Sequence, residues 1–254
     1  MKKGESFMEH ILECCVDSVE SALAAQAGGA DRLELCSGLV IGGISPTKAL
    51  FQKIREQVNL PIRVLLRPRF GDFCYSTYEH EILKEEVKMF RRLGADGVVI
   101  GSLTPDGSLD IRQMEELMEE AREMKVTLHR AFDMCRNPIE TFAQVKELGI
   151  DTILTSGQKN RAVEGMPLLK ELVERSQGDV EILVGSGVDA SVIETLYQNT
   201  KASSYHMSGK CVEESRMQYR NPDVSMGLAS MSEYEIWKTS EEKVREAKQC
   251  LVKL

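Results

Sequence analysis

The chain has 254 residues, of which 42% are hydrophobic and 28% are charged, and its 40 acidic and 32 basic residues give a net charge of −8. This length and composition are typical of a globular protein with a full hydrophobic core. The acidic balance, without a Lys/Arg-rich run, argues against a nucleic-acid partner. The lack of an 18-residue apolar run argues against a membrane span.

The seven cysteines are odd in number and scattered along the chain, which is not the pattern of a disulfide framework. Residues 1–8 lack the apolar segment of a secretory signal peptide. We therefore expect reduced thiols in a cytoplasmic protein.

Short apolar strands alternate with amphipathic helices along the chain. We predict strands at residues 10–16, 33–36, 61–68, 97–101, 125–132, 152–156, 180–184 and 203–208. We predict helices at residues 19–28, 46–58, 77–93, 110–124, 137–148, 166–175, 190–199 and 241–251. Eight such strand–helix units favour a (β/α)8 TIM barrel, forming a single domain over residues 1–254, with an open doubly wound sheet as the alternative.

A weak repeat supports this count of units. The triplets at residues 29–31, 94–96 and 149–151 all begin with Gly and end with Asp, where a helix stops and a strand begins. Glycine at that point supplies a left-handed helix cap. Residues 209–239 form the longest stretch without a predicted element, and a loop of that length is often a lid or an interface segment.

Thiols and carboxylates follow the first two strands. Glu13 and Cys15 share one face of their strand, as do Glu34 and Cys36. In a barrel the working face is the carboxyl end of the strands. On adjacent strands Cys15 and Cys36 would lie roughly 5 Å apart in the pairing direction, and two close thiolates suit Cu(I). Alternatively, both cysteines are small buried hydrophobic residues.

The candidate acid–base residues are Glu34, His129 and Asp133. His129 and Asp133 are four residues apart on a segment that we predict to be extended, so they share a face. Together with Glu13, Glu34 and His206, they form a set suited to a divalent ion or to proton transfer. Alternatively, the glutamates are held in a buried ion network by Arg67, Arg69 or Arg130.

The candidate anion-binding residues are Arg67, Arg69, Ser186, Gly187 and Ser208. The two arginines at the end of the third strand offer forked donors for a carboxylate or a phosphate. The other three follow the seventh and eighth strands, where such barrels often hold a phosphate group. Alternatively, the glycines there are needed only for tight turns.

These motifs, in this order, resemble the CutC family of copper homeostasis proteins. The matching segments are ECCVDS at 13–18, GADRLELC at 29–36, RPRFGDF at 67–73, HRAFDM at 129–134, LTSG at 154–157, GSGV at 185–188 and HMS at 206–208. They fall within residues 10–230. Phe70 departs from the family pattern, which usually has Gly at that position.

The resemblance implies a (β/α)8 barrel, a cytoplasmic location, a homodimer or higher homo-oligomer, and Cu(I) binding with Cys15 and Cys36 as ligands. Two functions stay open. One is a copper homeostasis protein that binds Cu(I) at the carboxyl end of the barrel. The other is an uncharacterised enzyme acting on a small phosphorylated or carboxylated metabolite, because so many polar groups exceed what a copper carrier needs.

Overall fold

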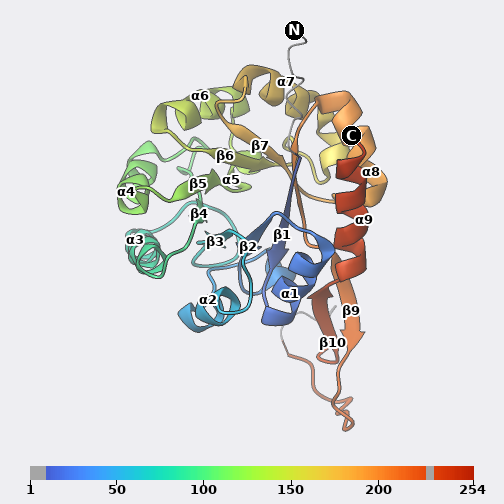
Figure 1. The fold of residues 1–254 in the computed structure, drawn as a ribbon. Coiled ribbons are helices and arrows are strands. Elements are labelled where there is room, and N and C mark those ends of the chain that lie inside the picture. The colour runs from blue at the N-terminus through green and yellow to red at the C-terminus, as the bar shows by residue number, and fades with distance from the viewer. Residues whose placement is uncertain (1–9, 227–231) are drawn as a thin grey trace.

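The structure, a computed structural model, describes residues 10–226 and 232–254. Within them, parallel strands β1 to β8 close in sequence order into a barrel that helices surround (Figure 1). The strands are β1 (Ile11–Val16), β2 (Arg32–Leu35), β3 (Ile62–Leu65), β4 (Gly97–Ile100), β5 (Lys125–Leu128), β6 (Thr152–Thr155), β7 (Glu181–Val184) and β8 (Ser204–Met207). The predicted (β/α)8 TIM barrel is confirmed.

The helices begin and end at local sequence features. The helix after β3 begins with a capping box, in which Ser76 and Glu79 each accept a hydrogen bond from the other's backbone N–H. Gly149, with φ of 72°, ends another helix in the left-handed conformation, as predicted. The helices are α1 (Val19–Gly28), α2 (Lys48–Arg55), α3 (Thr77–Arg92), α4 (Ile111–Ala121), α5 (Ala131–Met134), α6 (Pro138–Leu148), α7 (Met166–Ser176), α8 (Ala190–Thr200) and α9 (Glu241–Val252), with 3₁₀ turns η1 (Leu39–Ile41) and η2 (Ala162–Glu164).

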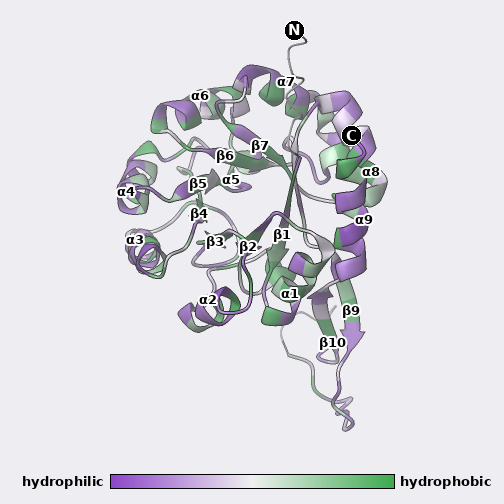
Figure 2. Cartoon of the chain, viewed as in Figure 1, coloured by the Kyte–Doolittle hydropathy of each residue, from purple (hydrophilic) through white to green (hydrophobic). Residues whose placement is uncertain are grey.

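The strands separate two interiors. Alternate residues of β1, such as Leu12 and Cys14, are fully buried in the hydrophobic core between strands and helices. Figure 2 shows mostly green on barrel strands such as β1 and mixed green and purple on the surrounding helices. Glu13 and Cys15 point to the other side of β1, into the barrel. The inside of the barrel is therefore where the polar residues collect.

Residues 209–239, predicted as a loop, contain two further strands. β9 (Lys210–Glu214) and β10 (Glu235–Thr239) pair antiparallel and extend away from the barrel (Figure 1). The backbone N–H of Thr239 donates to Ser21 Oγ and ties this ribbon to α1. Residues 227–231 lie outside the described part of the chain. No helix among the described residues is long and apolar enough to cross a membrane.

Candidate functional site

A cavity of about 500 Å³ opens at the carboxyl end of the barrel. Its lining includes five of the residues predicted from sequence, which are Cys15, Glu34, Arg67, His129 and Asp133. It also includes His206 and apolar side chains contributed by Leu39, Ile41, Leu65, Phe73, Met134 and Leu154. Five other predicted residues do not line this cavity, namely Cys36, Arg69, Ser186, Gly187 and Ser208.

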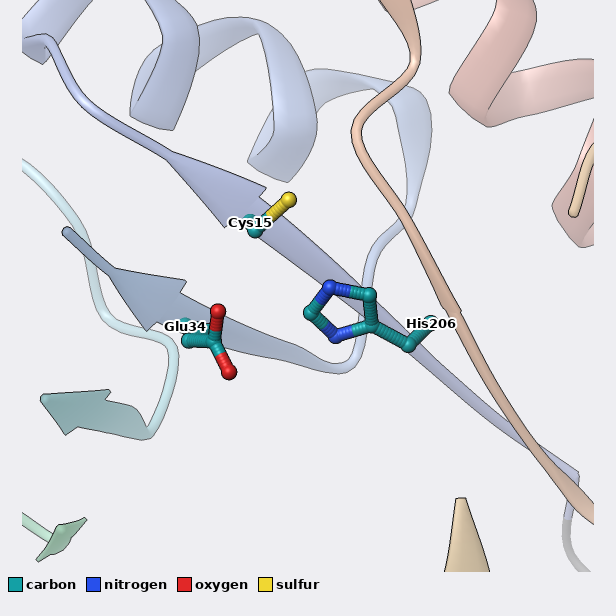
Figure 3. Close-up of side chains that lie close together, drawn as sticks. All are labelled: Cys15, Glu34 and His206. Atoms are coloured by element: carbon teal, nitrogen blue, oxygen red, sulfur yellow. The ribbon is translucent and has the colours of Figure 1, made fainter. Parts of the chain in front are cut away.

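Cys15, Glu34 and His206 come together on one side of the cavity. The thiol, a carboxylate oxygen and a ring nitrogen lie within 4.8 Å of one another (Figure 3). The strand register explains this, because Glu34 is the cross-strand partner of Cys15, and His206 is that of Glu13. We refer to these three residues as the Cys–Glu–His cluster.

A chain of buried ion pairs orients His206. Its Nδ1 lies 2.8 Å from a carboxylate oxygen of Glu13, which also accepts a hydrogen bond from Arg32. Arg32 in turn pairs with Glu181 at 2.9 Å. Burial alone would raise the pKa of Glu13, but Arg32 and His206 outweigh it and lower the pKa to about 2. The ionised Glu13 therefore occupies Nδ1 and leaves Nε2 of His206 for the cluster.

Glu34 is a buried carboxyl group with unfilled hydrogen-bonding capacity. Burial raises its pKa to about 7, although the nearby His206 acts to lower it. One carboxylate oxygen is fully buried and has no hydrogen-bond partner among the described residues. The predicted alternative, in which Arg67, Arg69 or Arg130 hold the two glutamates, is therefore wrong. Glu13 pairs with Arg32 instead, and Glu34 has no ion pair among the described residues.

The two cysteines occupy different levels of the barrel. Cys15 is 5% exposed, and burial raises the pKa of its thiol well above the ordinary value, so the free thiol is protonated. Cys36 lies two residues beyond Glu34, packs with Leu65 and Val99, and its Sγ is 3.6 Å from the carbonyl oxygen of Val16. The residue across from Cys15 is therefore Glu34, and Cys36 lies one step further along the barrel.

His129 begins a turn, which corrects the prediction of an extended segment to residue 132. β5 ends at Leu128, and the turn of helix α5 follows. His129 Nδ1 accepts a hydrogen bond from the Ala131 N–H at 3.1 Å, so its proton is on Nε2, which is buried without a partner among the described residues. Burial, and then the positive charge of Arg67, lower the pKa of His129 to about 3. The ring is therefore a neutral N–H donor.

Asp133 has its hydrogen bonds filled. Its carboxylate accepts from Thr155 Oγ1, the Ser156 N–H and hydroxyl, and the Gln158 N–H, and it pairs with Arg130 at 2.7 Å. It lines the cavity, but its oxygens hold the loop after β6 in place.

The two predicted anion-binding arginines differ in whether a carboxylate pairs with them. Arg69 pairs with Glu79 at 2.6 Å and with Asp72 at 2.9 Å. Arg67 donates to the carbonyl oxygens of Gly43 at 3.2 Å and Gly71 at 2.6 Å, and it has no carboxylate partner within the described residues.

Phe70 lies in this same loop. Its side chain is 67% exposed, and the neighbouring Gly71 takes the positive φ of 101° that the loop needs. Phenylalanine therefore fits at this position because it requires neither buried space nor a left-handed backbone.

The loops after β7 and β8 make their own internal bonds. Ser186 Oγ donates to the Asn160 carbonyl oxygen at 2.6 Å, and a Cβ on Gly187 would approach Arg161 to 2.9 Å. The carbonyl oxygen of Ser208 accepts from Thr239 Oγ1 at 3.1 Å. Gly187 and Ser208 line a separate hollow at the start of α8.

Sequence reasoning did not single out Arg32. A signal was present, because Arg32 and Glu34 are two residues apart on one strand and must share a face. Sequence reasoning named His206 only as one of several possible metal-binding or acid–base residues. The pairing of β1 with β8 places His206 opposite Glu13 and beside Cys15.

The fold and the cluster together define a (β/α)8 barrel with a candidate metal-binding group inside its carboxyl end. The family model of CutC matches residues 10–211, and the chain belongs to the CutC family. A human relative named copper homeostasis protein cutC homolog is 41% identical over 92% of this chain and 86% of its own length. A family protein CutC of Pasteurella multocida is 40% identical over 93% of this chain and 97% of its own. A solved CutC structure from Streptococcus agalactiae is 27% identical, with a TM-score of 0.75, covering 78% of this chain and 98% of the other.

Proposed function

We propose that this protein is a cytoplasmic copper homeostasis protein that binds Cu(I) at the carboxyl end of the barrel. The supporting observation is the Cys–Glu–His cluster, whose three ligand atoms lie within 4.8 Å. Cys15 would supply a thiolate and His206 its Nε2, and both donor types suit Cu(I). Cu(I) with one thiolate is neutral overall, which favours a buried site. Binding would displace the proton of the Cys15 thiol.

Cys36 is the second sulfur ligand in this proposal. Its Sγ faces the carbonyl oxygen of Val16 at 3.6 Å, so a rotation about its side chain is needed before it reaches a metal at the cluster. We therefore expect Cys36 to contribute less than Cys15. Glu34, with hard oxygen atoms, is a poor Cu(I) ligand, and we assign it the role of bordering the ion.

Competition with a chromophoric Cu(I) chelator tests the proposal. We expect Cys15→Ser to weaken Cu(I) binding most and Cys36→Ser less. The matched control is Cys135→Ser, because Cys135 is also buried but does not line the cavity. Equal, weak binding by the wild type and the Cys15→Ser/Cys36→Ser double variant would contradict the copper function. Tight binding of Zn(II) with weak Cu(I) binding would contradict the choice of metal.

A second candidate function is an enzyme acting on a small phosphorylated or carboxylated metabolite. The cavity of about 500 Å³ favours it, because that is the size of a small-molecule site and far exceeds one metal ion. Arg67 would hold the anion. Glu34, with its pKa of about 7, suits proton transfer. His129 would donate from its neutral ring, and Asp133 would hold the loop after β6 in place.

Thermal-shift screening against sugar phosphates and organic acids tests this second function. We expect stabilisation by an anion, lost in Arg67→Ala. Stabilisation that survives in Arg67→Ala, or none from any anion, counts against it. The homodimer or higher oligomer stays a prediction, and sedimentation velocity decides it.

A further inference from the structure

Two side chains near the ends of β3 and β5, Arg67 and His129, each have one N–H group without a hydrogen-bond acceptor among the described residues. Nε of Arg67 and Nε2 of His129 are both buried without an acceptor among the described residues. Both side chains pack on the ring of Phe73. The Arg67 guanidinium carbon is 5.0 Å from its centroid, and the His129 ring centroid is 4.6 Å away. Arg67, His129 and Phe73 all line the cavity, so the two buried donors lie just behind the same part of its wall.

The charge of Arg67 is also uncompensated. Arg69 and Arg130, the neighbouring arginines at this end of the barrel, each pair with a carboxylate. Arg67 donates to backbone carbonyl oxygens and interacts with the Tyr75 hydroxyl, but no carboxylate pairs with it in the described chain. A half-buried cation without a counterion is costly, and a bound anion would supply that counterion.

The chemistry of the cavity favours a carboxylate over a phosphate. One cation and one neutral N–H donor match a single negative charge, and the nearby Glu34 and Asp72 would repel a dianion. Gly187 and Ser208, in the loops where a barrel of this type often holds phosphate, line a different hollow. Most of the remaining lining is aliphatic or aromatic, which suits a short carbon chain.

We propose that the central cavity binds a small monocarboxylate, with its carboxylate at Arg67 and the Nε2–H of His129 and its carbon chain along Leu65 and Leu154. This inference rests on the second candidate function and narrows its substrate class. It uses other donors than the copper site, because Arg67 and His129 are not members of the Cys–Glu–His cluster, although both groups line the same cavity.

A ligand-observed NMR titration of the full chain at pH 7.5 tests the proposal with three probes. Butyrate has the required charge and chain, butyramide is its neutral isostere, and inorganic phosphate is the competing anion. We expect butyrate to bind at least ten-fold more tightly than either. Arg67→Gln should weaken butyrate binding about 10- to 100-fold, as expected for loss of a charge-assisted hydrogen bond.

Two further variants keep the test informative if Arg67→Gln perturbs its loop. His129→Asn retains an acceptor for the Ala131 N–H but removes the Nε2 donor, and we expect about ten-fold weaker binding. Arg136→Gln is the control for net charge, since Arg136 is exposed, pairs with Asp106 and does not line the cavity. It should bind butyrate as the wild type does. Thermal unfolding of each variant verifies that it is folded.

Three other outcomes would contradict the proposal, and each would contradict a different part of it. Tighter binding of phosphate than of butyrate overturns the carboxylate assignment and leaves the anionic-metabolite function standing. No binding of any anion at 20 mM of probe overturns both. Butyrate binding that persists in Arg67→Gln and His129→Asn places the anion elsewhere and overturns the proposed site.

Discussion

Polar residues of the cavity wall and polar residues of the surrounding loops differ in whether their hydrogen bonds are filled. On the wall, one oxygen of Glu34, Nε2 of His129 and Nε of Arg67 are buried without partners among the described residues. Asp133 also lines the cavity, but it accepts from Thr155 and from the loop after β6, and Ser186 in the loop after β7 donates to a carbonyl oxygen. Polarity alone therefore does not identify the site. Unfilled bonding capacity points to it only where it coincides with the cavity lining, because buried atoms of His80, Ser102 and Gln113 also lack partners among the described residues.

The largest expected effect concerns Glu13, which holds His206 in place. Glu13→Gln removes the charge that pairs with Arg32 in a buried position, and we expect a loss of about 3–5 kcal/mol in the free energy of unfolding at pH 7. The pKa of Glu13 is lowered in the folded state to about 2 from 4.5. Its contribution is therefore present above pH 4.5 and is lost as the pH falls through 2. Urea unfolding across this pH range measures the difference, and a constant difference down to pH 2 would contradict it.

Glu34 should behave in the opposite way. Its pKa is raised in the folded state to about 7 from 4.5, so the folded protein loses stability as the pH rises through 7. Glu34→Gln should therefore match the wild type near pH 4.5 and be more stable by about 3 kcal/mol at pH 8. Chemical denaturation at both pH values tests this. A Glu34→Gln variant less stable than the wild type at pH 8 would show that the Glu34 carboxylate has a stabilising partner and is not available to a ligand.

Asp133 tests the loop side of the comparison. Asp133→Asn places an amide N–H₂ against donors from Ser156 and Gln158, and we expect about 1–3 kcal/mol of destabilisation at pH 7. Chemical denaturation measures it. The free energies of butyrate and Cu(I) binding should change less than the free energy of unfolding does. Unchanged stability with abolished ligand binding would assign Asp133 to the site itself.

Ser186 should give the smallest effect. Ser186→Ala loses one hydrogen bond to the Asn160 carbonyl oxygen, worth about 1 kcal/mol. The matched control is Ser186→Gly, which loses the same bond but relieves the positive φ of 77°. We expect the glycine variant to be the more stable of the two by thermal unfolding. A large loss of anion binding in either would contradict the internal role of this loop.

Much of this site is predictable from the sequence, because side-chain alternation determines which face each residue takes. It correctly predicts that Glu13 and Cys15 share one face of β1, and the structure shows that this face lies inside the barrel. The position of each residue along the barrel axis depends on the stagger between neighbouring strands. The alternation of side chains within one strand carries no information on that stagger. That stagger places Glu34 across from Cys15, in the position expected for Cys36.

Hydrogen-bond occupancy is equally invisible in the sequence. The motif from His129 to Asp133 gives residue types suited to proton transfer, but a turn after Leu128 separates their roles. Asp133 becomes an acceptor for a neighbouring loop, and His129 keeps a free donor. Only the path of the backbone, fixed by contacts with β6 and its loop, decides between these outcomes.

The closure of the barrel by β1 and β8 also has a consequence for biosynthesis. The contact between Glu13 and His206 joins residues 193 positions apart. At ordinary translation rates the ribosome delivers His206 on the order of 10–40 s after Glu13. During that interval the nascent chain exposes the Cys15 thiol without the imidazole that completes its surroundings. Under the proposed copper function, binding that uses His206 therefore requires a chain that has been synthesised beyond residue 206.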